Sequence, residues 1–405
     1  MAKFNSKIKK VQKERKELFT NLQNFRKDFG IDEKVVLFHC VSMGELLNAK
    51  PLAKKIKERF PEIKIAVSFI SPSGYDNLKK SPEFDFKTYL PIDRYGNAEK
   101  FFSILKPLLW IIVKHDIWPA HIKACSDKNI PIILIDANLP EKSKRLQLFI
   151  RSFFKSFYKD IDLVMPVSEN DAERFLKVYP FKDKVIPVGD TRYDEVFANS
   201  RIAIDKQIKY LSFYKDKKVF TGGSVWKEDM KRVIPALPKL MSEFDDFYVI
   251  LVPHEPNKVQ ISYLEGELIN LKLAYNKYTE LNDFPSERIL IIDSVGILAS
   301  SYKYSYIAYV GGSFTTGVHN VMEPAIFESP VLFGPKHGNS FEALEMIKRG
   351  GAFSVSNSDD VYSLVSDFLK DTQKKEKSGK AAASVVLENL GATDRIMNYV
   401  ETYFH

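Results

Sequence analysis

The chain has 405 residues, of which 45% are hydrophobic and 28% are charged, with two cysteines and a formal net charge of +8. The length predicts two domains that each bury their own core, and the composition is ordinary for a soluble globular protein. The sequence argues against a metal site, nucleic-acid binding and a membrane-spanning segment. It lacks metal-ligand spacings, aromatic–basic RNA-binding motifs and apolar runs long enough to cross a bilayer.

Basic residues crowd the start of the chain. Apolar residues recur among them at roughly helical intervals, as at Phe4, Ile8 and Val11. This pattern predicts a basic amphipathic helix over residues 1–30 that contacts an anionic membrane surface. The alternative is a solvated first helix that packs one side on the protein body. The two cysteines, Cys40 and Cys125, indicate reduced thiols in a cytoplasmic setting.

Short apolar runs alternate with amphipathic segments along the rest of the chain. We expect a first series of strands at 34–39, 63–69, 108–113, 130–135 and 163–167. A second series is expected at 218–221, 247–252, 288–292, 306–310, 331–333 and 352–355. Strands that alternate with helices predict parallel sheets covered on both faces.

The two series predict two doubly wound domains that face each other across a cleft. The first occupies residues 31–195 and the second 216–390, with a hinge at 196–215 and a C-terminal helix at 391–405 that packs on the first domain. Ligands of such sheets bind beyond the carboxyl ends of the strands. We therefore expect the functional residues in the loops that follow the strands.

In the first domain, Glu45 stands just after the first strand, at the start of a helix. A carboxylate in this position can serve as a general base. It can equally form an S-x-x-E capping box with Ser42, and by pattern alone capping is the stronger interpretation. Lys114 and Asp116 follow the 108–113 strand and indicate a second site loop. Near the hinge, Arg192 could bind a phosphate or carboxylate, or form a salt bridge with Asp194 or another neighbour.

In the second domain, four loops at strand ends carry small or polar residues and favour nucleotide binding. They are 221–224 with two glycines, 253–256 with His254, 293–296, and the segment 311–324. The last runs from a buried strand through Gly311, Gly312 and Gly317 to a helix expected near 325–327. A strand, a glycine turn and a helix start can hold an anion. The alternative is an ordinary loop with helix-capping residues.

These loops, in this order, resemble the Kdo transferases, which move 3-deoxy-D-manno-oct-2-ulosonic acid from CMP-Kdo to lipid A precursors. The similar motifs are V-S-M-G-E ending at Glu45, G-G-S ending at Ser313, and H-N-V-M-E-P over 319–324. The resemblance runs from about residue 39 to 353. It implies an α/β protein of the GT-B fold, with two facing Rossmann-like, doubly wound parallel-sheet domains and an interdomain cleft.

The resemblance also implies roles for individual residues. Glu45 would be the base, and Arg192, Lys114 and Asp116 would complete the catalytic set. CMP would be held by Pro253, His254, Val295, Gly296, Ile297, Gly312, Ser313, Asn320, Val321, Met322 and Glu323. The donor substrate would be CMP-Kdo and the acceptor a lipid A precursor (lipid IVA), with no metal and no other cofactor. The enzyme would work at the cytoplasmic face of the inner membrane, attached peripherally or by an anchor segment absent from this chain.

The sequence departs from the family at two of these positions. Lys114 replaces a glutamate with a proposed transition-state role, and His254 replaces an arginine that would meet the phosphate. Two alternatives therefore stand beside the Kdo transferase. One is another GT-B enzyme, such as a UDP-sugar transferase or a nucleotide-sugar epimerase, and the other is a non-catalytic nucleotide- or lipid-binding relative.

Overall fold

The computed structural model describes residues 2–30, 33–78, 81–114 and 116–404, with the side chains of residues 2–13 and 77 left outside the description. The chain divides into two compact units. The first comprises Met1–Glu195 and Leu390–His405, and the second comprises Val196–Asn389. The segment that we expected as a hinge, 196–215, belongs to the second unit. It continues helix α8 (Thr191–Asp205) and then forms a 3-10 turn, Leu211–Tyr214.

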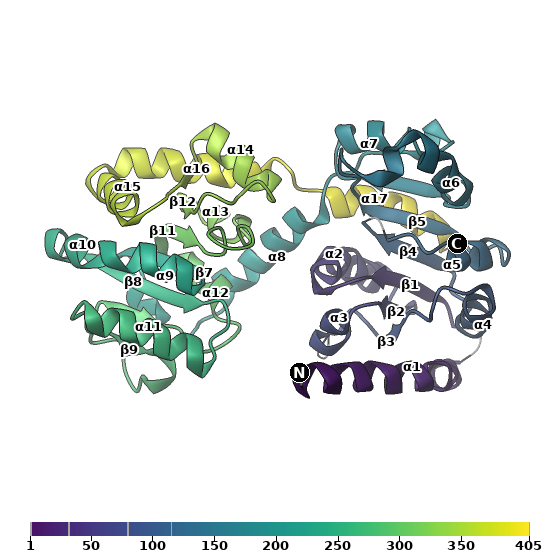
Figure 1. Ribbon diagram of the computed structural model, residues 1–405, viewed down its shortest axis with the longest axis horizontal. Coiled ribbons are helices and arrows are strands. Elements are labelled where there is room, and N and C mark those ends of the chain that lie inside the picture. The colour runs from purple at the N-terminus through teal and green to yellow at the C-terminus, as the bar shows by residue number, and fades with distance from the viewer. Residues whose placement is uncertain (1, 31–32, 79–80, 115, 405) are drawn as a thin grey trace. The chain divides into compact units, whose positions relative to one another are not determined.

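The first unit contains a six-stranded sheet in the order β3-β2-β1-β4-β5-β6, and all its paired strands are parallel. Helices lie on both faces of this sheet (Figure 1). The strands are β1 (Val35–Cys40), β2 (Lys64–Phe69), β3 (Phe86–Tyr89), β4 (Leu109–Val113), β5 (Ile132–Ala137) and β6 (Leu163–Pro166). The helices are α1 (Ala2–Phe29), α2 (Met43–Arg59), α3 (Pro72–Asn77), α4 (Tyr95–Leu105), α5 (Pro119–Ser126), α6 (Leu148–Tyr158), α7 (Glu169–Phe175) and α17 (Ala392–Val400).

The second unit contains a seven-stranded parallel sheet in the order β13-β12-β11-β7-β8-β10-β9. Its strands are β7 (Lys218–Val225), β8 (Phe247–Pro253), β9 (Asn276–Lys277), β10 (Ile289–Ile291), β11 (Ser305–Val310), β12 (Val331–Phe333) and β13 (Ala352–Ser354). Its further helices are α9 (Lys227–Val233), α10 (Leu237–Glu243), α11 (Lys258–Asn270), α12 (Leu298–Ser301), α13 (Met322–Ala325), α14 (Phe341–Arg349), α15 (Ser358–Lys370) and α16 (Thr372–Leu387). Both units are therefore doubly wound α/β domains, and this prediction is confirmed.

One predicted loop is wrong. We expected a glycine loop at 221–224, but β7 continues through Gly222 and Gly223 to Val225. The glycines serve close packing inside the strand. A β-carbon at Gly223 would lie 1.9 Å from the hydroxyl oxygen of Tyr302, and one at Gly222 would lie 3.0 Å from Leu251. Glycine is found in strand interiors where another group approaches this closely.

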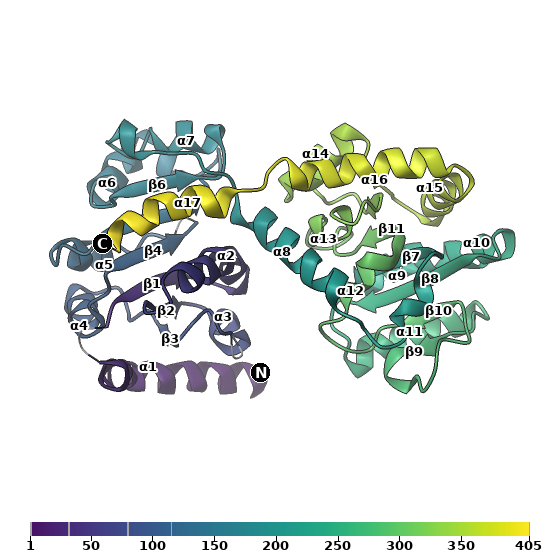
Figure 2. The ribbon, with the colours of Figure 1, turned by 180° about the vertical axis from the view of Figure 1, so that it is seen from behind.

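The C-terminal segment packs within the first unit. Ile396, Met397 and Val400 of α17 are fully buried in the core of that unit. Arg59 of α2 donates to the carboxylate of Glu401 at 2.6 Å. The path of α17 alongside the first unit can be followed in Figure 2.

The N-terminal helix packs one side on the same unit. Leu18, Leu22 and Phe25 of α1 are buried, and the ring of Phe25 stacks on Phe86 of β3 with centroids 4.4 Å apart. The basic side chains up to Lys13 lie outside the described part of the chain, so a membrane contact of this surface stays a prediction.

The strand orders place one switch point in each sheet, where the chain starts in the middle and winds outward in opposite directions. In the first unit it lies between β1 and β4, and in the second between β7 and β11. Loops that leave neighbouring strands in opposite directions open a crevice at such a point, and ligands bind there. The carboxyl ends of these two strands are therefore where a ligand of each unit is expected to bind.

Candidate active site

Glu45 lies at the switch point of the first sheet, in the first turn of α2. Its Oε2 accepts a hydrogen bond from the backbone N–H of Val41. Ser42, the residue that precedes the helix, makes no side-chain capping bond. The capping box that was the simpler interpretation of this motif is therefore not formed. Among the described residues, the second carboxylate oxygen of Glu45 has no hydrogen-bond partner, so it is left for a ligand.

The surroundings of Glu45 set its proton affinity. Burial raises the pKa of Glu45 and is the largest effect. The Val41 N–H, Lys114 and His39 lower this pKa, and Asp116 raises it. The side chains of the two strand ends thus act on one carboxyl group, as the strand-end rule predicted for Lys114 and Asp116. Lys114 itself has a left-handed backbone, with φ of 68°.

Asp116 is held in place by two neighbours. Its Oδ2 lies 3.1 Å from Nε2 of His39 and accepts a hydrogen bond of 2.5 Å from the indole N–H of Trp118. The other ring nitrogen of His39 lies 2.9 Å from Oγ of Ser68. His39, the buried residue near the end of β1, is a member of this cluster that sequence reasoning did not assign.

Arg192 forms the salt bridge that was the alternative interpretation of the sequence, and its partner is the neighbour Asp190 rather than Asp194. Its Nε and Nη2 donate to Oδ2 of Asp190 at 2.9 and 2.7 Å. Asp194 instead accepts from the backbone N–H groups of Gly391 and Thr393, both at 2.7 Å, and so ties down the start of α17. The bidentate ion pair holds the guanidinium group in one orientation.

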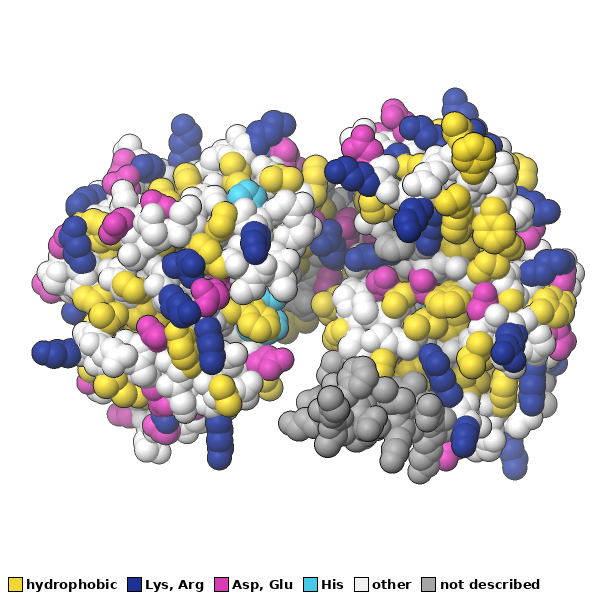
Figure 3. Space-filling view, viewed as in Figure 1, with side chains coloured by type: hydrophobic (Ala, Val, Ile, Leu, Met, Phe, Trp, Pro, Cys, Tyr) yellow, Lys and Arg dark blue, Asp and Glu magenta, His cyan; other side chains and the backbone are white. Residues whose placement is uncertain are grey.

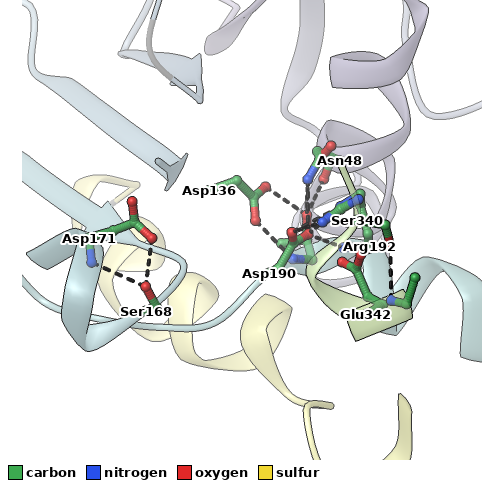
Figure 4. A network of polar contacts seen from close by, with 10 residues as sticks. Asn48, Asp136, Ser168, Asp171, Asp190, Arg192, Ser340 and Glu342 are labelled. Atoms are coloured by element: carbon green, nitrogen blue, oxygen red, sulfur yellow. Dashed lines mark hydrogen bonds and ion pairs between the residues drawn. The ribbon is translucent and has the colours of Figure 1, made fainter. Parts of the chain in front are cut away.

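A second carboxyl group, that of Asp136, is buried beside this ion pair. Figure 4 shows Asn48, Asp136 and Asp190 converging beside Arg192. Oγ1 of Thr191 lies 2.6 Å from Oδ2 of Asp136 and 2.8 Å from the carbonyl oxygen of Asn48. The hydroxyl of Thr191 can donate to either of these oxygens, and the backbone N–H of Thr191 donates to Oδ1 of Asp136 at 2.8 Å.

The surroundings of Asp136 favour its protonated form. Burial, with the charge of Asp190 added, raises the pKa of Asp136 to about 7. A neutral Asp136 leaves Asp190 as the ionised partner of Arg192, since two adjacent carboxylates do not both ionise readily. None of this was visible in the sequence, because Asp136 and Thr191 are 55 positions apart.

In the second unit, Asp229 organises the switch point. Its carboxylate accepts the backbone N–H of Trp226 at 2.8 Å, the backbone N–H of Gly312 at 3.0 Å and the hydroxyl of Tyr309 at 2.7 Å. These donors come from the end of β7 and the end of β11. The glycine segment is therefore anchored by a buried acid on α9, which sequence reasoning missed.

Three flat rings stack beside this anchor. The ring of His254 stacks on Trp226, at 4.4 Å, and on His319, at 4.5 Å, which lie nearly in one plane at 9° to each other. The indole N–H of Trp226 donates to Nε2 of His319 at 2.8 Å, which places the imidazole proton on Nδ1. Burial, and then His254, lower the pKa of His319 to about 4, so this ring is neutral at pH 7.

The segment 311–324, which we predicted to hold an anion, differs from that prediction in where its helix begins. The helix starts at Met322 rather than near 325, and the N–H of Met322 already donates to Oδ1 of Asn320 at 3.1 Å. Nδ2 of Asn320 donates to Glu323 at 3.1 Å. Burial raises the pKa of Glu323 and this hydrogen bond lowers it. The exposed Asn320 and its partner Glu323 are thus available as paired polar groups.

The remaining predicted contacts are of two kinds. Ser313, Val321 and Met322 have buried side chains, and Oγ of Ser313 accepts the N–H of Gly334 at 2.5 Å. Only the backbone of these residues can face a ligand. Val295 is 79% exposed and Gly296 has φ of 82°, whereas Ile297 is buried at the start of α12. Pro253 is buried at the end of β8.

No cluster of potential metal ligands occurs among the residues that the structure describes. Of the described helices, none is both long enough and apolar enough to cross a membrane.

The chain is similar in sequence to one group of known proteins. Residues 12–195 match the family model of 3-deoxy-D-manno-octulosonic-acid transferase (kdotransferase). The 3-deoxy-D-manno-octulosonic acid transferase of Haemophilus influenzae is 26% identical over 377 residues, which cover 91% of this chain and 87% of that protein. The chain is a relative of the Kdo transferases. The Rickettsia felis protein of the same name is 26% identical over 362 residues, covering 88% of this chain and 76% of its own.

Among solved structures, a UDP-GlcNAc 2-epimerase from Neisseria meningitidis, bound to UDP-GlcNAc, superposes with a TM-score of 0.64 at 14% identity. The match covers 91% of this chain and all of the epimerase chain. At this identity the likeness concerns the fold alone, which is the GT-B fold predicted for this relative of the Kdo transferases.

Proposed function

We propose that the chain is an inverting glycosyltransferase that moves Kdo from CMP-Kdo to a lipid A precursor, lipid IVA, in lipopolysaccharide biosynthesis. The observation that carries the proposal is the state of Glu45 in the unit that matches the Kdo transferase model. One oxygen of Glu45 is fixed by a backbone N–H, the other has no partner among the described residues, and the carboxyl lies at a topological switch point.

In the proposed reaction, the carboxylate of Glu45 accepts the proton of an acceptor hydroxyl. The hydroxyl oxygen then forms a bond to the anomeric carbon of Kdo, while the bond from that carbon to the phosphate oxygen breaks and its electron pair leaves with CMP. Attack opposite the leaving group inverts the anomeric centre. The raised pKa of Glu45 makes it a stronger base than an exposed glutamate, which favours proton transfer near neutral pH.

The second unit would hold the leaving group. Its polar groups at the switch point are those expected for a nucleoside monophosphate. Asn320 and Glu323 offer an amide and a carboxylate to ribose hydroxyls, and His254 presents an exposed ring backed by Trp226 and His319. The positive charge of Arg192, oriented by Asp190, would stabilise negative charge that develops as CMP departs.

The two departures from the family pattern fit this proposal in different ways. Lys114 lowers the pKa of Glu45 and thereby helps to keep this carboxyl ionised before proton transfer. One face of the His254 ring stacks on Trp226 and His319, and the residue is exposed, so the ring is held in place and can meet a ligand.

We also propose an anionic membrane surface as a partner, at the cytoplasmic face of the inner membrane where a lipid acceptor would reside. A surface on the first unit supports this. Leu148, Phe149 and Phe153 of α6 are 72%, 98% and 58% exposed. Arg151 and Lys155 accompany them on the same helix. Apolar side chains gather over α6 in the space-filling view (Figure 3). Aromatic residues flanked by basic ones bind the interface of anionic lipids.

The donor is tested by calorimetry with CMP and UDP on the full chain. We expect saturable CMP binding and much weaker UDP binding. Binding of UDP but not of CMP would contradict the proposal and favour an enzyme of the UDP-sugar type, whose fold this chain shares. The acceptor is tested by incubating the chain with freshly generated CMP-Kdo and tetra-acylated lipid A precursor and measuring the product mass. This mass also gives the number of Kdo units added.

A further inference from the structure

The second unit contains a cavity away from the candidate nucleotide site. It has a volume of about 1000 Å³ and lies at the amino ends of β7 and β11, where Lys217 and Tyr304 precede the two strands. The candidate nucleotide site is at the carboxyl ends of the same strands. Further walls come from the 3-10 turn Leu211–Tyr214, from Phe284 and from α16. We call this the amino-edge cavity.

The amino-edge cavity is strongly cationic. Its walls carry a single acidic residue, Asp216, against five lysines: Lys209, Lys215, Lys217, Lys303 and Lys375. Counting these side chains, five positive charges and one negative charge leave +4. A concave surface lined by charges of one sign raises the local concentration of ions of the opposite sign, so this excess indicates an anionic ligand.

The lysines are not neutralised within the unit. Among the described residues, none of the five forms a salt bridge. Nζ of Lys303 donates to the carbonyl oxygen of Ile204 at 2.7 Å, and Nζ of Lys375 donates to that of Glu328 at 3.3 Å. Nζ of Lys217 lies 4.4 Å from the ring centroid of Phe213. These contacts hold the ammonium groups in place without removing their charge.

Among the five lysines, Lys375 gives the strongest indication of a bound anion. Burial lowers the pKa of its ammonium group. The charges of Glu328 and Glu376 raise this pKa to a lesser extent, but neither carboxylate forms a salt bridge with Lys375 among the described residues. An anion bound beside the ammonium group would offset its cost of burial. The ring of Tyr306 lies 4.8 Å from Nζ of Lys375 and gives the cation an aromatic face on one side.

Aromatic side chains line the same cavity. Tyr210, Phe284 and Tyr304 contribute ring surfaces, and the rings of Tyr210 and Phe284 meet edge to face at 6.3 Å. Rings beside ammonium groups suit a ligand that has both a charged end and an apolar or planar portion. A simple halide or sulfate would use only the lysines.

We propose that the amino-edge cavity binds a ligand through a phosphate monoester or diphosphate group. The same group occurs on a free metabolite, such as a nucleotide, and on the headgroup of a phosphorylated lipid. Phosphate is favoured over a lone carboxylate because several ammonium donors surround one concave space, and a phosphate offers several charged acceptor oxygens. This site is distinct from the nucleotide site of the proposed function and does not depend on it.

The test compares two double variants of the full chain. Lys209→Gln with Lys215→Gln removes two exposed cavity charges, and Lys348→Gln with Lys380→Gln removes two exposed charges elsewhere in the same unit. Inorganic pyrophosphate is titrated by calorimetry. We expect the cavity variant to bind about tenfold more weakly than wild type, since two exposed charged contacts of less than about 1 kcal/mol each together contribute about 1.4 kcal/mol. The control variant should bind like wild type.

A second measurement uses wild type alone, so that it does not depend on the variants folding. Lysines are acetylated with and without pyrophosphate and quantified by mass spectrometry. Protection of Lys209, Lys215 and Lys303, with Lys348 unprotected, supports the site. Equal weakening in both variants, or no selective protection, would overturn it, since pyrophosphate would then bind elsewhere or by net charge only.

Vesicles distinguish the two sources of the phosphate group. The chain is mixed with phosphatidylcholine vesicles that contain or lack phosphatidic acid, and the bound fraction is measured by sedimentation. A loss of binding to phosphatidic acid in the cavity variant, but not in the control, assigns the cavity to a lipid headgroup. Unchanged vesicle binding together with weakened pyrophosphate binding assigns it to a free phosphorylated molecule.

Discussion

The glycine segment at the second switch point can be tested through Gly312→Ala. Gly312 has φ of 98°, and a β-carbon there would lie 2.5 Å from the carbonyl oxygen of Gly317 and 2.7 Å from the ring of His319. The left-handed backbone alone costs an alanine about 1 to 2 kcal/mol. Forcing a methyl group into filled space adds about 1 to 3 kcal/mol. We therefore expect Gly312→Ala to destabilise the second unit by about 2 to 5 kcal/mol.

Gly296→Ala is the matched control. Gly296 also has a left-handed backbone, with φ of 82°, but a β-carbon there would meet nothing within 4 Å. This variant should lose only the free energy that an alanine with a left-handed backbone costs, about 1 to 2 kcal/mol of unfolding free energy. The difference between the two variants therefore isolates the clash with Gly317 and His319.

Native-state hydrogen exchange with peptide resolution is the suitable assay, because it reports the opening free energy of each unit separately. Peptides that contain β7 and β11 should exchange faster in Gly312→Ala than in Gly296→Ala, while peptides of the first unit stay unchanged. Equal exchange in the two variants would refute the packing of the glycine segment described here.

Three further predictions concern other contacts. Since the pKa of Asp136 is raised to about 7 from an unfolded value near 3.9, this group makes the protein less stable as pH rises between those values, by up to about 1.4 kcal/mol per pH unit. Chemical denaturation at several pH values should show that Asp136→Asn removes this slope, and an unchanged slope would argue against a protonated Asp136. Trp226→Phe removes the donor to His319 and should destabilise the second unit by about 1 to 3 kcal/mol in denaturation curves. A variant as stable as wild type would contradict the importance of this hydrogen bond. Asp194→Ala should speed hydrogen exchange in α17 selectively, because its bonds to Gly391 and Thr393 are lost, and uniform exchange would contradict this anchor.

Most of the strands could be predicted because they are buried on both faces. β1, β4 and β5 have no exposed residue, and apart from His39 in β1 and Asp136 in β5 their sequences are apolar runs. β3 and β9 escaped prediction since both are edge strands, with half-buried residues and no such run. The glycines inside β7 were misinterpreted because glycine marks both loops and places of close packing, and only the position of Tyr302 decides between them.

The positions of the candidate site residues that follow directly after strands could be predicted from the sequence. Glu45, Lys114 and Asp116 follow neighbouring strands, and their electrostatic influence on one another is what that neighbourhood requires. The supporting residues were not predictable. Asp190 bonds to Asn48 across 142 positions, and Trp226 bonds to His319 across 93. Contacts of this separation depend on how helices and loops pack, and no local spacing in one sequence reports them.

The central claim is that Glu45 is the base of a Kdo transfer reaction, and Glu45→Gln tests it most directly. Glutamine keeps the size of the side chain and can still accept the N–H of Val41, so fold and CMP affinity should be preserved. The measurement is the rate of Kdo transfer from CMP-Kdo to lipid IVA, with CMP binding measured in parallel. We expect wild type to transfer Kdo, and the variant to do so about 10² to 10⁴ times more slowly while its CMP affinity is unchanged. Wild-type transfer rates in the variant, or an equal loss of transfer and CMP binding, would contradict it.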